Sequence, residues 1–229
     1  SDLHLEFGDL YLNNDEGADV LILSGDILVA SDMKSFMYDE NAQIVAATSS
    51  KKAKADSYMT FMRGCLENFK HVVFVMGNHE HYHGRLDKTR QTIETIMPSN
   101  VTILDRDCEE YQGVLFLGGT LWTDLNRGDW HTIYHLKQNM NDFHVIQNYY
   151  DVGARYGKLI PEYTAGIHFK TVEYFKTVLE QNRDKPVVVI THHAPSFASV
   201  NAKYKGDTLM NGGYASELGE FILDHPNIK

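Results

Sequence analysis

Four short motifs supply side chains of the kinds that bind divalent metal ions. Each motif follows or borders an apolar run, and together they contain Asp2-Leu3-His4, Gly25-Asp26, Gly77-Asn78-His79-Glu80 and Thr191-His192-His193. Mixed oxygen and imidazole ligands suit Mn, Fe, Zn or Mg better than a metal that selects thiolates. Two such ions, roughly 3.5–4 Å apart, would clamp the attacking and leaving oxygens of a phosphate ester. The motifs therefore predict a two-metal site that cuts phosphate esters.

Each motif also has an ordinary structural interpretation. A Gly-Asp pair after a strand is usually a turn, a lone Asp-x-His is more often structural, and a His-His pair is often part of a loop. Gly77-Asn78-His79-Glu80 is more specific, because a turn does not require that run of residues. The chemical interpretation is favoured because all four motifs occur in one chain, each at the edge of an apolar run.

The elements that must position these motifs are strands with helices between them. Continuous apolar runs predict strands over 20–23, 71–76, 101–104, 114–119 and 186–190. Apolar residues at helical spacing predict helices over 57–69, 86–97, 164–181 and 216–223. Strands alternating with helices are typical of an α/β fold. Three motifs follow the carboxyl ends of predicted strands, where open α/β sheets hold their sites.

The remaining stretches are less regular. We expect residues 1–4 to be the end of a strand, on which Asp2 and His4 would point to the same side. Residues 27–56 contain a polar excursion, and residues 124–163 predict an irregular or helical cap-like insertion. The length suits one domain over 1–229. Because both ends break at predicted elements, we expect that domain to be truncated at both ends.

Composition limits the classes of partner that the protein can bind. Lys and Arg number 21 against 31 Asp and Glu, which gives a formal charge of −10 and argues against a long-duplex nucleic-acid surface. A phosphate substrate remains compatible, since bound dications reverse the local field. The two cysteines, Cys65 and Cys108, predict free thiols and a cytoplasmic location. No segment has the length and apolarity of a membrane span.

The motifs resemble the calcineurin-like metallophosphoesterase family, over nearly the whole chain. That resemblance implies a four-layer α/β/β/α sandwich with two divalent metal ions between its sheets. Asp2 and His4 would bind the first ion, Asp26 would bridge both, and Asn78 and His192 would bind the second. His79 would be the catalytic histidine, and His193 would lie behind the ligands. A hydroxide held by the two ions would attack phosphorus.

Further segments resemble a bacterial and phage subgroup of largely unassigned phosphohydrolases. These are residues 118–124, Met140-Asn141-Asp142-Phe143 and residues 192–196. Two departures from the wider family stand out. Asp26 is followed by Ile27-Leu28-Val29-Ala30 without an arginine, which disfavours a protein phosphatase. A late Gly-His-x-His is absent before Lys229, and we expect the full polypeptide to carry it.

The predicted function is hydrolysis of a small phosphomonoester or phosphodiester, with a nucleotide among the candidate substrates. Two alternatives stay open. One is a non-catalytic scaffold that keeps this fold and binds a protein partner, which the absent final motif favours. The other is a nuclease that acts on short nucleic-acid ends.

Overall fold

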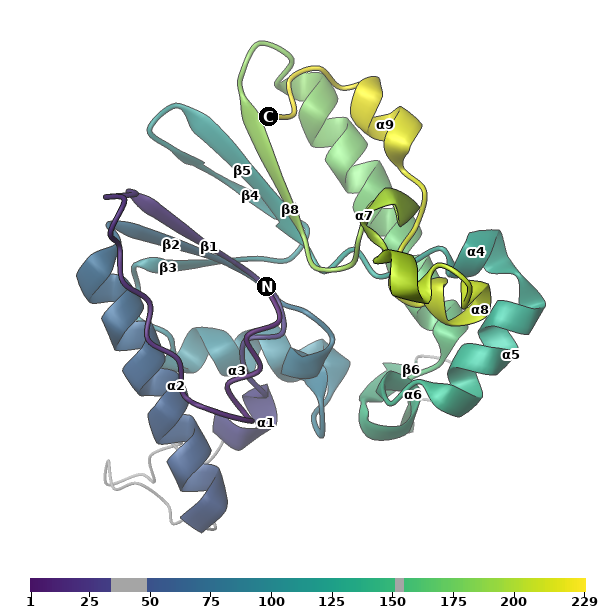
Figure 1. The fold of residues 1–229 in the computed structure, drawn as a ribbon, viewed down its shortest axis with the longest axis horizontal. Coiled ribbons are helices and arrows are strands. Elements are labelled where there is room, and N and C mark those ends of the chain that lie inside the picture. Colours follow the sequence, from purple (N-terminus) through teal and green to yellow (C-terminus); the bar gives the residue numbers. More distant parts are fainter. Residues whose placement is uncertain (34–48, 151–154) are drawn as a thin grey trace. The chain divides into compact units, whose positions relative to one another are not determined.

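The computed structural model describes residues 1–33, 49–150 and 155–229, which divide into two compact units (Figure 1). The first comprises Ser1–Ile103 and Ile146–Gly157, and the second comprises Leu104–Val145 and Lys158–Lys229. Part of the predicted excursion (34–48) and part of the cap-like insertion (151–154) lie outside the described residues. No helix in the described residues is long and apolar enough to cross a membrane.

The first unit is built on a three-stranded sheet of order β1-β2-β3. Its strands are β1 (Val20–Ser24), β2 (His71–Val75) and β3 (Val101–Leu104), the last of which ends at the unit boundary. β1 and β2 are parallel, with Ser24 opposite Val75, so the motifs that follow both strands emerge at the same sheet edge. All five residues of β2 are buried, as its continuous apolar sequence predicts.

Helices pack on this sheet (Figure 1). They are α1 (Ala30–Met33), α2 (Ser49–Asn68) and α3 (Thr89–Ile96), with short 3-10 turns η2 (His79–His81) and η3 (Leu86–Lys88). The shared core includes Tyr58 and Met62 of α2 with Val72 and Phe74 of β2. The helix α2 begins eight residues before the predicted start, because its first turns are polar and show no apolar periodicity.

A two-stranded ribbon also belongs largely to the first unit. It pairs β6 (Gln147–Tyr150) with β7 (Arg155–Lys158), and it was not predicted. The amide of Gln147 donates to the Gly84 carbonyl, and the Arg85 guanidinium lies 4.0 Å from the centre of the Tyr156 ring. The ribbon therefore attaches to the loop that follows the Gly77-Asn78-His79-Glu80 motif.

The second unit has a three-stranded sheet of order β4-β5-β8. Its strands are β4 (Asp107–Tyr111), β5 (Val114–Gly119) and β8 (Val187–Thr191). β4 and β5 form an antiparallel hairpin, whereas β5 and β8 are parallel. Gln112 and Gly113 turn the hairpin with φ of 50° and 80°, as two-residue hairpin turns require.

The long helix α7 (Pro161–Gln181) covers this sheet (Figure 1). Phe175 and Leu179 of α7 pack with Leu115 and Leu117 of β5. Shorter helices complete the unit: α4 (Leu125–Gly128), α5 (Trp130–Asn139), α6 (Asp142–Val145), α8 (Thr208–Asn211) and α9 (Gly219–Leu223), with 3-10 turns η4 (Phe197–Ser199) and η5 (Ala202–Tyr204). The helix α9 starts three residues later than predicted, since Ser216 instead accepts a hydrogen bond from the Asp124 amide.

A buried histidine of α7 gives the second unit an expected sensitivity to acid. His168 is 2% exposed and contacts the backbone of Leu121 and Trp122. Burial lowers the pKa of His168 below its ordinary value of 6.5, against the opposing effects of the Asp124 charge and the backbone contacts. The unfolded chain takes up the proton first, so this contribution to stability is complete above about pH 6.5 and is lost as the pH falls.

We therefore expect His168→Gln to flatten the loss of thermal stability between about pH 7 and about pH 5. Tryptophan fluorescence measures this unit selectively, because both tryptophans of the chain, Trp122 and Trp130, lie in it. His144→Gln, at an exposed position of α6, is the matched control. An acid dependence of His168→Gln equal to that of the wild type would contradict the assignment.

Candidate metal centre

The loop after β1 carries the central carboxylate of the site. β1 ends at Ser24, and Gly25 and Asp26 then turn the chain with φ of 79° and 55°. Asp26 is only 4% exposed. One of its carboxylate oxygens, Oδ1, accepts a hydrogen bond of 2.9 Å from the amide of His79. The two motifs that follow neighbouring strands are thus joined through Asp26 itself.

The chain's first residues run beside this loop, although not as the predicted strand. The amide of Asp2 donates to the Gly25 carbonyl, and the amide of His4 donates to the Asp26 carbonyl. Residues 1–4 have no strand structure, and Asp2 and His4 have positive φ of 56° and 47°. The expected strand end is therefore wrong, because these residues bond to a loop rather than to a sheet edge. Both side chains nevertheless reach the site.

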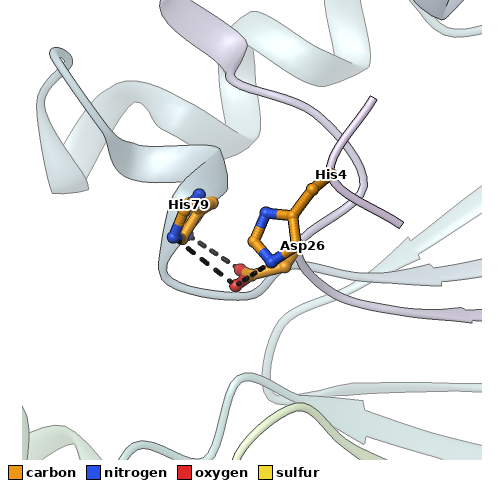
Figure 2. Close-up of side chains that lie close together, drawn as sticks. All are labelled: His4, Asp26 and His79. Atoms are coloured by element: carbon orange, nitrogen blue, oxygen red, sulfur yellow. Dashed lines mark hydrogen bonds and ion pairs between the residues drawn. The ribbon is translucent and has the colours of Figure 1, made fainter. Parts of the chain in front are cut away.

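Three side chains converge here: His4, Asp26 and His79 (Figure 2). Each offers a ligand atom within 4.8 Å of the other two. A carboxylate oxygen of Asp2 also lies within 4.8 Å of one of Asp26. Asp26 is thus common to both sets of neighbours, as a bridging carboxylate must be.

The spacing of these groups fits a divalent ion. Asp26 Oδ2 is 3.8 Å from His4 Nε2 and 3.9 Å from His79 Nε2. Both distances exceed a hydrogen bond, and both are within the span of two ligand bonds of about 2.1 Å each. A carboxylate with two imidazoles is also a donor set that Zn, Fe and Mn accept.

Asp2, His4 and Asp26 share a second feature, which is their left-handed backbone conformation. Non-glycine residues adopt positive φ at a cost in energy, and such residues concentrate at functional sites. Here the conformation is held by the hydrogen bonds of Asp2 and His4 to the 25–26 loop. Part of the backbone strain is therefore located at residues that are predicted to bind metal.

Glu80 ties the two loops of the site together. Its side chain is almost completely buried, at 1% exposed. Oε2 accepts from the amides of Asp26 (2.9 Å) and Gly77 (2.6 Å), and Oε1 accepts from those of Ile27 (2.7 Å) and Leu28 (3.1 Å). Four backbone donors thus converge on one carboxylate, which fixes the Asp26 loop against the His79 loop. The role is positional, since these bonds hold the loops and not a ligand.

Glu6 and Tyr82 contact His79 and were not predicted from the sequence. Glu6 Oε1 is 2.8 Å from His79 Nδ1 and 3.1 Å from His4 Nδ1. The Tyr82 ring stacks on the His79 ring with centroids 4.1 Å apart. Burial alone would raise the pKa of Glu6, but hydrogen bonds with His79, with its own backbone and with His4 hold it below the ordinary value. The spacing Asp2, His4, Glu6 was the available signal, because alternate residues can share a side.

Asn78 and His192, the two remaining predicted ligands, lie in different units and differ in burial. Asn78 is buried directly before η2, between β2 and His79. His192 follows β8 in the second unit, half-buried and next to His193. His193 is buried, its Nδ1 lies 3.1 Å from the Thr120 carbonyl oxygen, and its ring stacks on Trp122. The roles of Asn78 and His192 as metal ligands remain predictions.

The second unit also contains a pocket beside the residues that follow His192. Its volume is about 580 Å³, and Ala194 lines it together with Val200, Tyr204, Met210 and Tyr214. That volume lies in the range of small-ligand sites. The lining is mostly apolar, which suits an organic group rather than a phosphate.

Comparison with known proteins identifies the family. A model of calcineurin-like phosphoesterases matches residues 1–228. The chain belongs to this family. Its α/β fold is accordingly of the metallophosphoesterase type. The family resemblance and the fold class predicted from the sequence are thereby confirmed.

Individual relatives add less detail. An uncharacterised protein of Acanthamoeba polyphaga mimivirus is 25% identical over 172 residues, which cover 69% of this chain and 58% of that protein. The chain thus spans little more than half of this relative's length. A solved phosphopantetheinyl hydrolase from Mycobacterium tuberculosis is 15% identical, with a TM-score of 0.56 over 93% of this chain and 73% of that one. At that identity the likeness shows the fold alone.

Proposed function

We propose that this protein hydrolyses a small phosphomonoester or phosphodiester with two divalent metal ions. The observation that carries the proposal is the convergence of the His4 and His79 imidazoles on the buried carboxylate of Asp26. Asp26 would be shared by both ions, with Asp2 and His4 as ligands of the first. Asn78 and His192 are proposed for the second on their sequence positions alone. Mn is the first metal to test, with Fe, Zn and Mg as alternatives.

The chain's own groups have distinct proposed tasks. Bound metal ions would lower the pKa of water and offset the charge on the phosphate. The Asp26 carboxylate would bind both metal ions. Its hydrogen bond from the His79 amide fixes the distance between Asp26 and His79. His79, when both of its ring nitrogens are protonated, would deliver the Nε2 proton to the leaving oxygen while Nδ1–H stays bonded to Glu6. Nε2 is the ring atom that faces Asp26. Tyr82, stacked on the ring, limits its rotation.

The proposed substrate is small, and a nucleotide is one candidate. The formal charge of −10 disfavours a long duplex. We also propose a cytoplasmic location, because neither cysteine is in a disulfide in the described part of the chain. No membrane partner is proposed.

Metal removal and replacement tests the function. The full polypeptide is treated with a chelator, and hydrolysis of a chromogenic phosphomonoester and a chromogenic phosphodiester is measured before and after adding Mn, Zn or Mg. Turnover should disappear with the chelator and return with at least one metal. Asp26→Asn should bind less metal by elemental analysis, because it loses the shared charge. Single-stranded and duplex oligonucleotides tested on the same preparation separate a nuclease from an esterase.

A protein that retains two metal ions yet turns over none of these substrates would contradict the proposal and favour the non-catalytic scaffold.

A further inference from the structure

One carboxylate contacts both histidines of the metal centre. Glu6 is nearly buried, with a side chain 5% exposed. Its Oε1 lies 2.8 Å from His79 Nδ1 and 3.1 Å from His4 Nδ1. Its Oε2 is buried and has no hydrogen-bond partner among the described residues. A single oxygen atom therefore serves two imidazole rings.

This contact decides which nitrogen of each ring carries the hydrogen. A carboxylate accepts hydrogen bonds and has none to donate. Both Nδ1 atoms must therefore donate to Glu6, which leaves Nε2 as the atom that each ring presents elsewhere. Those two Nε2 atoms lie 3.8 and 3.9 Å from Asp26 Oδ2. Figure 2 draws the three side chains with their contacts as dashed lines.

Packing supports the same arrangement. The rings of His4 and His79 meet edge to face with centroids 4.4 Å apart. Tyr82 stacks on His79, and Phe7 lies 5.9 Å from the His4 ring centre. A ring flip at either histidine would place a carbon atom against Glu6 and lose a partly buried hydrogen bond. The orientations of the two rings therefore depend on each other.

We propose that Glu6 is a positioning residue that holds His4 and His79 in the Nδ1–H tautomer at the same time, so that both direct Nε2 to the metal centre. The effect of Glu6 on hydrolysis rests on the proposed function. The assignment of the two tautomers does not depend on that function. The motif Asp2-Leu3-His4 is thereby extended by Glu6, which acts through the two histidines without touching the substrate.

The direct test reads the tautomers of the metal-free protein. Nitrogen NMR of histidine-labelled protein is recorded well above the ordinary histidine pKa of about 6.5, with His4→Gln and His79→Gln to assign the two signals. Wild type should show Nδ1–H at both residues. Glu6→Ala should shift both toward the Nε2–H form. Glu6→Gln should keep Nδ1–H, because its amide oxygen can still accept both bonds.

The variants also separate positioning from general loss of structure. Glu67→Ala removes a carboxylate from the exposed face of α2 and should leave both tautomers unchanged. For hydrolysis, Glu6→Ala should lower kcat by about 10–100-fold with a smaller change in KM, and Glu6→Gln should recover most of it.

Three outcomes are decisive. An Nε2–H form at either histidine of the wild type would overturn the proposal, and so would unchanged tautomers in Glu6→Ala. If Glu6→Ala does not fold, Glu6→Gln and the wild type still decide the assignment. The predicted tautomers in a protein that hydrolyses no phosphate ester would support the role of Glu6 while overturning the proposed function.

Discussion

His79→Ala is expected to lower kcat for phosphate-ester hydrolysis by about 10²–10⁴-fold, the range for loss of a positioned proton donor. The His79 ring has three neighbours: Glu6 at Nδ1, Tyr82 stacked on its face, and His4, whose ring meets it edge to face. Its Nε2 is directed to Asp26, where the proposed centre lies. A leaving oxygen without this proton would depart as an alkoxide, which raises the barrier.

Metal content distinguishes the two roles that are chemically open to His79. As the proton donor, His79→Ala should keep the wild-type number of bound metal ions while kcat falls. If His79 is instead a ligand, metal content should fall together with kcat, and that result would contradict the proposed role. His83→Ala is the matched control, because His83 is an exposed histidine of the same loop and should leave both quantities unchanged.

Glu80→Ala is expected to destabilise the first unit by about 3 kcal/mol or more. The substitution removes the carboxylate that accepts hydrogen bonds from the amides of Asp26, Ile27, Leu28 and Gly77. A buried donor without an acceptor costs about 1–3 kcal/mol, and here four donors lose one at once. The Asp26 loop would separate from the His79 loop, so metal binding should weaken as well.

Amide hydrogen exchange measures the loss of stability at the four amides that donate to Glu80. The four amides should exchange about 10²-fold faster or more in Glu80→Ala than in wild type. Tryptophan fluorescence serves as an internal reference, because Trp122 and Trp130 both belong to the second unit. Glu67→Ala, on the exposed face of α2, should leave the four amides protected. Unchanged exchange in Glu80→Ala would show that the carboxylate does not hold the loops.

The sequence was sufficient for the central strands. Each continuous apolar run became a strand within one residue of its predicted ends, because burial of such runs leaves few alternatives. The strands β4, β6 and β7 were missed. β4 has the sequence Asp-Cys-Glu-Glu-Tyr, whose charges suit an edge strand and hide its β character. Its pairing with β5 is what makes it a strand, and pairing is not visible in local sequence.

For the site, the sequence determined which residue types stand at which strand ends, and hence the family and its metal-dependent chemistry. Parallel β1 and β2 bring Asp26 and His79 together, which the strand–motif order predicts. The sequence did not determine that Asp2 and His4 reach Asp26 through left-handed turns, or that Glu6 joins two histidines. Those features depend on contacts between residues as far apart as 6 and 79, and only the folded chain decides such contacts.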